Sequence, residues 1–206
     1  MPPVPVDGCA PEDATVDDAT VDAARCGDAA AFGRLWARLS PKVAAYFRAH
    51  GVDESDDLTS EVFLAAFRQV GRFVGGAEAF RALLFSIAHR RYVDWVRQRT
   101  RRGVTQPWHD LDEDPRATAS AETEAMVGLG DERVVALLSG LTPDQREVIA
   151  LRVLADLTLE QTALVLGRDV GSVKSLQHRG LARLRKKVAT DPYPSGRLVR
   201  LNPRHA

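Results

Sequence analysis

The segment from residue 158 to residue 187 constrains this chain more than any other, because it carries the signals of two helices joined by a tight turn. Thr158 and Gln161 have the spacing of a capping box at the start of the first helix. Gly167 stands where that helix should end, and Asp169 can cap the second helix. This pattern is typical of a helix-turn-helix, whose second helix enters the major groove of DNA.

The second of these helices is predicted to have one apolar face and one basic face, because residues 171–187 contain six basic residues and no acidic residue. The positions that recur at helical spacing, and should face the core, are Val173, Leu176, Gly180, Leu181, Leu184 and Val188. The open side then carries Ser172, Lys174, Ser175, His178 and Arg179. An ordinary amphipathic helix with a solvated basic face is the alternative, and the agreement of turn, caps and charge favours DNA binding.

Charge is distributed unevenly along the 206 residues, although 28 basic and 28 acidic residues give no net charge. Residues 1–24 carry six acidic residues and no basic one, whereas residues 81–102 carry seven arginines and one acidic residue. Residues 103–140 are acidic again, with eight acidic and two basic residues. Two basic blocks separated by acidic stretches predict two anion-binding surfaces, and a nucleic-acid backbone is the commonest partner of such surfaces.

The chain is predicted to be all-α, with two small helical domains joined by an acidic linker and the second domain a helix-turn-helix. No segment has the alternation of a strand, and helical periodicity begins near Asp28. The expected divisions are an acidic N-terminus over 1–26 that is disordered or only locally helical, a first domain over 27–102, a linker over 103–130, a second domain over 131–189 and a tail over 190–206. Thr142 and Gln145 form another capping box inside the second domain.

The helix predicted within residues 80–102 interleaves aromatic and basic side chains. These are Phe80, Phe85, Tyr92 and Trp95, with Arg81, Arg90, Arg91, Arg97 and Arg99 between them. Aromatic rings can stack on unpaired bases while arginines hold the phosphate backbone, so this helix suits single-stranded or melting DNA. A place in the core is the better interpretation of Phe80, Leu84, Ile87 and Ala88.

Three segments, in this order and at this spacing, resemble the extracytoplasmic-function (ECF) sigma factors, the compact two-domain initiation factors of bacterial RNA polymerase. The segment DDLTSEVFLAAFRQ, at residues 56–69, is similar to the family's segment that docks on the polymerase clamp. Residues 80–102 are similar to the segment that melts and reads the −10 promoter element, and residues 141–185 to the domain that reads the −35 element. The resemblance covers residues 28–188.

The resemblance implies three sets of contact residues. Those for core polymerase are Asp57, Leu58, Glu61, Val62, Phe63 and Arg68. Those for the −10 element, together with the loop over 71–79, are Arg81, His89, Arg90, Tyr92, Trp95, Arg97 and Arg99. Those for the −35 element are Ser172, Lys174, Ser175, Gln177, His178, Arg179 and Arg183. Whether Leu176 or Gln177 faces the DNA is open at this point.

The function implied is that of a cytoplasmic sigma factor that binds core RNA polymerase and promoter DNA and is held inactive by an anti-sigma factor. The acidic linker, with Asp110, Asp112, Glu113 and Asp114, either occupies the nucleic-acid path of the polymerase or is a solvated tether. The N-terminus has no basic segment followed by an apolar core, so no signal peptide is predicted, and no segment is expected to insert into a membrane.

No catalysis, cofactor or metal site is expected. The sequence lacks the GxxxxGK[ST], HExxH and GxSxG motifs, and its five histidines form no cluster along the chain. Cys9 and Cys26 are interpreted as reduced thiols without a structural role.

Two other classes of function stay open. A duplex-binding regulator that does not engage polymerase would explain the helix-turn-helix but would leave residues 56–69 and 80–102 without a role. A helical adaptor whose basic faces bind acidic proteins would have no salt-dependent affinity for promoter DNA in the presence of core enzyme.

Overall fold

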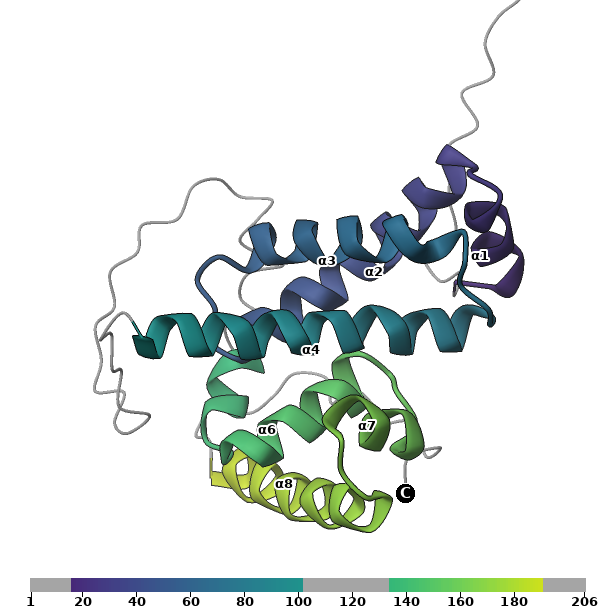
Figure 1. Ribbon diagram of the computed structural model, residues 1–206. Coiled ribbons are helices and arrows are strands. Elements are labelled where there is room, and N and C mark those ends of the chain that lie inside the picture. Colours follow the sequence, from purple (N-terminus) through teal and green to yellow (C-terminus); the bar gives the residue numbers. More distant parts are fainter. Residues whose placement is uncertain (1–15, 102–133, 191–206) are drawn as a thin grey trace, which may run out of the picture.

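A computed structural model describes residues 16–101 and 134–190 of this chain, and every regular element in these ranges is helical (Figure 1). The first range forms α1 (Asp18–Arg25), α2 (Ala29–Ala49), α3 (Ser55–Val70) and α4 (Ala77–Arg101). The second range forms a helical segment over 134–139, then α6 (Pro143–Ile149), the π-helical turn η1 (Ala150–Leu154), α7 (Leu159–Leu166) and α8 (Val170–Thr190). The all-α prediction is confirmed, whereas most of the expected linker and tail lies outside the described residues.

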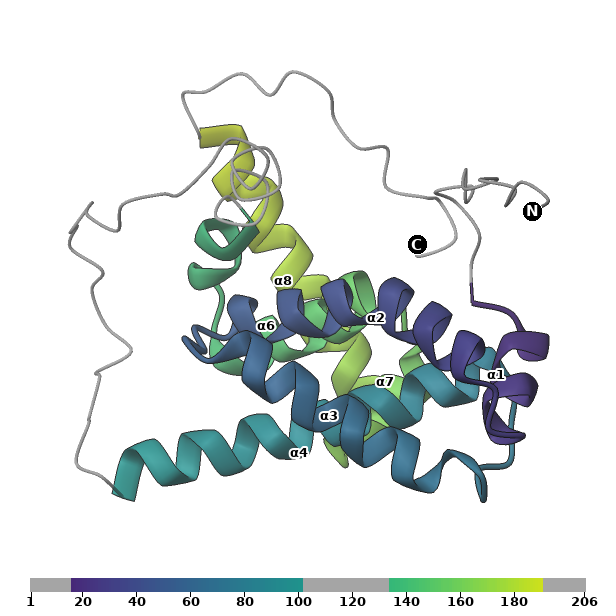
Figure 2. The same cartoon turned by 90° about the horizontal axis from the view of Figure 1, so that it is seen from above.

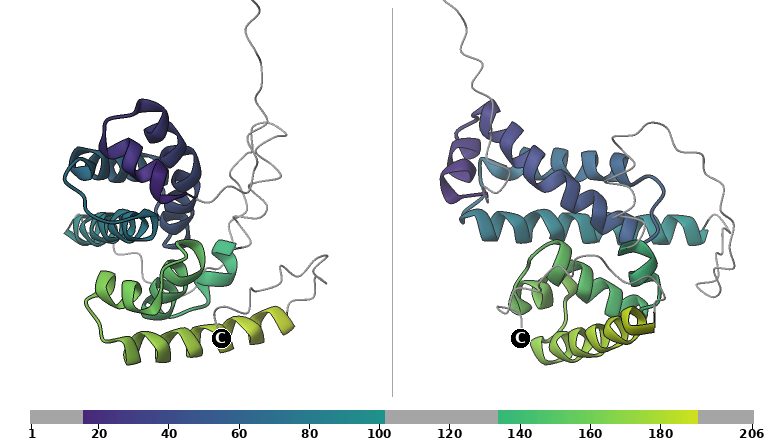
Figure 3. Two further views of the ribbon diagram at one scale, coloured as in Figure 1. Left: turned by 90° about the vertical axis from the view of Figure 1, so that its right-hand side faces the viewer. Right: turned by 180° about the vertical axis from the view of Figure 1, so that it is seen from behind.

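The helices are arranged in two layers. In Figures 1 and 3, α1 to α4 form one layer, α6 to α8 form the other, and α4 runs along the boundary between them. In both views α8 lies on the side of its layer that is turned away from α4. The C-terminal part of α4 extends beyond the other helices, as the view from above makes clear (Figure 2). The two helices with the most basic sequences therefore occupy different positions, one between the layers and one on the outside.

Residues 1–26, which are predicted to be disordered or only locally helical, are helical in their last part. Residues 18–25 form α1, whose N-cap Asp17 accepts a hydrogen bond from the backbone N–H of Thr20 at 2.9 Å. Val21 and Ala24 are completely buried in the main hydrophobic core. A helix of this length is not stable alone in water, so packing against the rest of the domain supplies the order that the local sequence does not predict. Residues 1–15 lie outside the described residues.

The core of the first layer is built from aromatic side chains that α2, α3 and α4 contribute at helical spacing. The largest fully buried aromatic residues are Tyr46, Phe47, Phe63, Phe80 and Phe85. The ring of Tyr46 makes edge-on contacts with the rings of Phe47 and Phe85, at centroid distances of 5.5 and 5.9 Å. The expectation that Phe80, Leu84, Ile87 and Ala88 belong to the core is confirmed. This packing fixes α4 against α2 and α3 along its N-terminal half.

The helix-turn-helix forms as its local signals predict. Both capping boxes are present, at Thr142 with Gln145 and at Thr158 with Gln161. Gly167 ends α7 with φ at 61°, in the left-handed region that glycine enters without steric cost. The backbone N–H of Ser172 donates to Asp169 Oδ1 at 2.7 Å, so Asp169 caps α8.

The apolar face of α8 is buried along its first half and partly exposed beyond it. Val173, Leu176 and Gly180 are buried, whereas Val188, which was expected to face the core, is 40% exposed. Gly180 lies so close to Ile149 that a Cβ atom there would be 3.0 Å from Ile149 Cγ1. Val188 lies near the end of the described helix, beyond the turns that pack on α6.

One continuous hydrophobic cluster joins the two layers. Leu151, Ala155 and Leu157, from η1 and the turn that follows it, belong to the same buried cluster as the aromatic core of the first layer. Ala49, from α2, packs with Leu138, Leu141 and Ile149 in a second cluster. The surface at which the two layers meet, here called the seam, therefore contains buried apolar packing from both layers.

Candidate DNA and polymerase interface

The outer face of α8 carries most of the side chains predicted to bind the −35 element. Lys174, Ser175, His178, Arg179 and Arg183 are exposed, and Ser172 is half-buried at the start of the helix. These residues share one side of the helix because the opposite side packs on α6 and α7. The structure therefore brings a polar and basic group of side chains together on a convex, accessible helix.

Burial distinguishes Leu176 from Gln177, the two residues of which either could face the DNA. Leu176 is 7% exposed and packs with Val148, Ala163 and Val173. Gln177 lies at the edge of the surface, and its side-chain oxygen accepts a hydrogen bond from Arg152 Nε at 3.0 Å. Leu176 consequently belongs to the core, and the amide of Gln177 is already engaged within the domain.

The residues predicted to read the −10 element fall into two groups along α4. On the projecting C-terminal half, Trp95 donates its indole N–H to Glu54 at 3.0 Å, and Arg99 lies over the Trp95 ring at 4.9 Å. Arg90 and Arg97 are exposed on the same half. In contrast, Arg81, His89 and Tyr92 lie at the seam and contact other residues there.

The seam is organised around one acidic side chain, Glu147 of α6. Its Oε1 accepts a hydrogen bond from the Tyr46 hydroxyl at 2.6 Å and lies 2.8 Å from Nδ1 of His89. Its Oε2 lies 2.9 Å from Nε2 of His50, a ring that is 2% exposed. The other nitrogen of His50 lies 2.7 Å from the backbone oxygen of Tyr46. Both nitrogens of His50 therefore face oxygen atoms.

A second ion pair crosses the seam near the start of α4. Arg81 contacts the carboxylate of Asp156 at 2.8 Å, and the arginine side chain is only 19% exposed. Asp156 follows η1 and has a positive φ of 53°. Asp tolerates the left-handed conformation better than most residues, and here the turn directs its carboxylate toward α4.

These contacts shift the proton affinities of the groups involved. Burial by itself would raise the pKa of Glu147, and the hydrogen bonds and charges of His50 and His89 overcome that effect and hold the pKa well below its usual range. Burial, followed by the charge of Glu147, raises the pKa of Tyr46 well above 10. The same two causes raise the pKa of Tyr92 to about 12. Glu147 is thus an ionised carboxylate in a site that admits little water.

The face of α3 predicted to dock on polymerase is only partly exposed. Asp57, Glu61 and Arg68 lie on the surface, with Leu58 half-buried, and Glu61 pairs with Arg91 of α4 at 3.5 Å. Val62 and Phe63, which belong to the same predicted set, are 0% and 1% exposed because they pack into the core between α2 and α4. Leu64 is 57% exposed on the outer side of α3, and sequence reasoning missed it. Its position three residues after Glu61 was the available signal.

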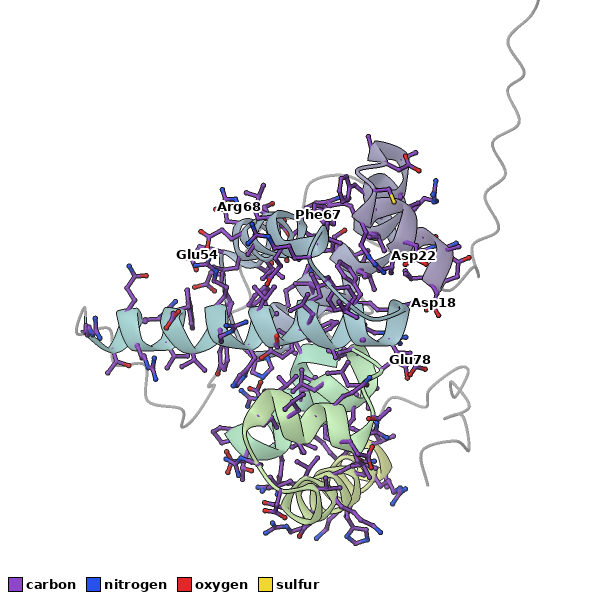
Figure 4. The ribbon with its side chains drawn as sticks, turned by 45° about the vertical axis from the view of Figure 1, so that its right-hand side comes forward. Asp18, Asp22, Glu54, Phe67, Arg68 and Glu78 are labelled. Atoms are coloured by element: carbon purple, nitrogen blue, oxygen red, sulfur yellow. The ribbon has the colours of Figure 1, made fainter. Side chains whose placement is uncertain are left out.

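A shallow groove separates the first half of α3 from the end of α4. Leu58 and Glu61 line it on one side, and Arg91, Trp95 and Arg97 line it on the other. Figure 4 places the side chains of Glu54 and Arg68 at the outer side of α3, whereas Phe67 packs against Phe32 and Phe63. The predicted polymerase-binding and −10-binding residues therefore meet along one groove.

Other expectations concern metals, cofactors and membranes. Within residues 16–101 and 134–190, no group of three or more histidine, cysteine or acidic side chains is arranged to hold a metal ion. The described helices include none that is long and apolar enough to cross a membrane. His50 and His89, which form no cluster in the sequence, meet at Glu147 in the structure.

Comparison with known proteins identifies the family. The family described as "Sigma-70 region 2" matches residues 35–102, and "Sigma-70, region 4" matches residues 137–186. The ECF sigma factor SigD of Mycobacterium tuberculosis is 33% identical over 177 residues, which cover 83% of each chain. This chain belongs to the ECF sigma factors. The sigma factor described here thus has its region 2 in α2 to α4 and its region 4 in the elements from 137 onward.

Three further proteins show the extent of the similarity. The ECF sigma factor BldN of Streptomyces coelicolor is 32% identical over 173 residues, which cover 83% of this chain and 65% of BldN, less than two thirds of that relative. The solved structure of CnrH in complex with the cytosolic domain of CnrY has a TM-score of 0.59 and 27% identity, and the match covers 85% of this chain and 98% of CnrH. The sigma factor RpoE of Bartonella quintana, solved with the anti-sigma factor NepR, has a TM-score of 0.57 and 22% identity, and this likeness concerns the fold alone.

The first prediction concerns the charge of Glu147. We expect Glu147→Gln to lower the free energy of unfolding at pH 7 by about 1–3 kcal/mol, because the neutral amide loses the charge-assisted bonds to His50 and His89. A depressed folded-state pKa stabilises the fold above the unfolded value of about 4.3 and loses that contribution as the pH falls. Urea unfolding between about pH 7 and pH 3 should therefore give a steeper fall for the natural chain than for the variant. Glu61→Gln, on an exposed carboxylate, is the matched control, and equal slopes for Glu147→Gln and the natural chain would contradict the assignment.

Proposed function

We propose that this sigma factor binds core RNA polymerase and directs promoter-specific initiation by reading a −35 duplex with α8 and a melted −10 element with α4. One observation carries the proposal: a single chain of the ECF family presents a basic helix-turn-helix and, in a separate layer, an arginine- and aromatic-rich helix. The first suits intact duplex, and the second suits unpaired bases. The proposal assigns no catalysis to this chain, and it places the protein in the cytoplasm, where bacterial polymerase acts.

The −35 contacts are assigned to the outer face of α8. Residues near the start of a recognition helix reach base edges, so Ser172, Lys174 and Ser175 are proposed to contact bases or the nearest phosphates. Arg179 and Arg183, further along the same face, are proposed to hold phosphates. His178 is exposed beside them, whereas Gln177 must first release Arg152 if it is to bind DNA.

The −10 contacts are assigned to α4 and to the loop over 71–76. Trp95 and the exposed Arg90 and Arg97 offer a ring for stacking and charges for phosphates on the projecting half of the helix. Val74, in the loop, is 87% exposed and is therefore accessible to an unstacked base. The contact with core polymerase is assigned to the exposed face of α3, which is formed by Asp57, Glu61, Leu64 and Arg68.

The described arrangement is proposed to be a closed form that must open before promoter DNA can bind. Arg81, His89 and Tyr92 are candidates for −10 binding, and all three contact groups at the seam. The acidic side chains of Asp156 and Glu147 contact Arg81 and His89 and would compete with phosphates for them. Separation of the two regions would release these groups and allow each region to reach its own promoter element.

A protein inhibitor is the proposed regulator. CnrH, a relative at 27% identity with the same fold, was solved with the cytosolic domain of a second protein, CnrY. We propose that an anti-sigma factor binds this chain and keeps it from polymerase. Purification from unstressed cells should yield a stoichiometric inhibitor, and recovery of polymerase alone would contradict this part of the proposal.

The function is tested by adding the purified protein to core bacterial RNA polymerase and genomic DNA fragments and sequencing the run-off transcripts. We expect discrete start sites that share two upstream motifs at fixed spacing. Duplex binding without such start sites would support a regulator that does not engage polymerase. Absence of both transcripts and salt-dependent DNA binding would support the adaptor interpretation.

The assignment of Arg183 to phosphate binding predicts a change in salt dependence. Arg183→Ala should weaken binding of region 4 to −35 duplex about equally for all sequences and should lower the slope of log affinity against log salt by about one. Lys42→Ala removes an exposed charge from α2, far along the chain from α8, and should leave the slope unchanged. Fluorescence anisotropy between about 50 and 200 mM salt measures both variants, and an unchanged slope for Arg183→Ala would remove this residue from the interface.

The closed form predicts that the two regions separate when the sigma factor binds polymerase and promoter. Donor and acceptor dyes on cysteines introduced at Ser60 and Lys186, in a chain without Cys9 and Cys26, should transfer less energy after core enzyme and promoter are added. In the free protein, Glu147→Ala should lower the transfer as well, because it leaves His50 and His89 without their carboxylate. Glu160→Ala, on an exposed acidic residue of α7, is the control. Equal transfer in the free and promoter-bound states would contradict opening.

A further inference from the structure

The loop between α3 and α4 is held by an acidic residue from a distant part of the chain. Gly76 occupies the position before the first residue of α4 and has no side chain with which to cap the helix. The backbone N–H of Ala77 instead donates to Oδ1 of Asp18 at 2.7 Å, across 59 residues of sequence. Figure 4 shows Asp18 at the N-terminal end of α4. A helix is usually capped by a Ser, Thr, Asn or Asp that directly precedes it in the sequence. Here Asp18, which is distant in the sequence, takes that role for α4.

The contact between Asp18 and the loop leaves no room for a side chain at residue 76. A Cβ atom on Gly76 would lie 2.3 Å from Oδ1 and 2.6 Å from Cγ of Asp18. Gly76 has no positive φ, so its backbone would accept alanine if Asp18 were not there. Glycine at this position is thus explained by the close approach of the carboxylate.

The remainder of the loop is anchored beside this contact. Phe73 is half-buried, and its ring meets Phe80 edge-on at 5.7 Å. Gly75 has a φ of 142°, which L-residues rarely adopt, and a Cβ there would lie 2.8 Å from that of Ala79. On either side of Phe73, Arg72 and Val74 are exposed. The loop therefore presents two side chains outward from a backbone with little freedom.

Asp18 is itself held in place by α1. Asp17 caps this helix through Thr20, and Val21 and Ala24 bury its inner face. The carboxylate of Asp18 therefore reaches α4 from a helix that is packed into the core.

We propose that Asp18 is a positioning residue for promoter reading: it caps α4 from α1, fixes the loop over 71–76, and so sets where Arg72 and Val74 meet the −10 element. This inference rests on the proposed function of the loop. It gives α1 a role in promoter selectivity, although the one basic residue of α1, Arg25, pairs with Asp22 at the surface.

The geometry is tested first by hydrogen exchange on the full-length protein. Asp18→Ala should speed exchange of the Ala77 amide by roughly fivefold, the factor that corresponds to loss of a helix cap. Asp18→Asn keeps an oxygen at the Oδ1 position and should retain most of the protection. Asp22→Ala removes an acidic residue from the same helix, where it pairs only with Arg25 at the surface, and is the matched control. Unchanged protection in Asp18→Ala would overturn the cap.

Selectivity is tested by transcription with core polymerase from a promoter found in the run-off experiment and from copies with single substitutions in its −10 element. Asp18→Ala should reduce the ratio of transcription from the natural and substituted promoters at least fivefold, while affinity for the −35 duplex stays unchanged. Asp18→Asn should restore the ratio, and Asp22→Ala should not alter it. A lower melting temperature with an unchanged ratio would make Asp18 merely structural and overturn the proposal.

A double variant separates the contact from a general loss of stability. Gly76→Ala should reproduce the loss of selectivity, because its methyl group collides with the Asp18 carboxylate. In the Asp18→Ala background the same change should have little further effect, since the colliding atoms are gone. Additive effects of the two substitutions would overturn the contact. If the natural chain itself does not respond to −10 substitutions, the proposed function of the loop fails, whereas failure of Asp18 alone leaves a selective natural chain.

Discussion

The carboxylate of Glu147 is the constraint on which the closed arrangement depends. Transfer of an ionised carboxyl group from water into a protein interior costs several kcal/mol unless its oxygens find partners. Here Tyr46, His50 and His89 surround it, and all three belong to region 2, whereas Glu147 belongs to region 4. The two regions can therefore not slide past each other without leaving this charge buried and unpaired. The apolar cluster around Leu151 and Leu157 provides the buried hydrophobic surface of the seam. Glu147 fixes the position of region 4 relative to region 2.

The same constraint connects stability with function. In this arrangement Arg81 and Tyr92 of α4, which suit phosphates and bases, already contact other residues at the seam. The outer face of α8 stays accessible. Polymerase and promoter DNA would have to offer α4 better partners than region 4 offers. The projecting end of α4, with Trp95 and Arg97, is already exposed and could make the first contact. The closed form would thus limit promoter binding without hiding every binding residue.

Sequence reasoning succeeded where a structural feature depends on residues close together in the chain. The caps at Thr142, Thr158 and Asp169 and the left-handed Gly167 were all predicted, because each is defined by hydrogen bonds and backbone angles within a few residues. It did not reveal how α1 packs, because local composition predicts disorder or only local helix for residues 1–26 and tertiary packing orders residues 18–25. Nor did the match of Val62 and Phe63 to a family segment reveal that this side of α3 faces the core.

The sequence by itself determined the helical class, the family and the helix-turn-helix, since these follow from periodicity, caps and the order of three segments. Tertiary structure alone decided which side chains meet. Glu147 and Tyr46 are 101 residues apart, and Asp18 and Ala77 are 59 apart. Nothing in the local pattern around these residues distinguishes them from others of their kind. Their roles arise because packed helices bring a carboxylate next to donors that are distant in the sequence. Burial of the carboxylate without such partners would be costly in free energy.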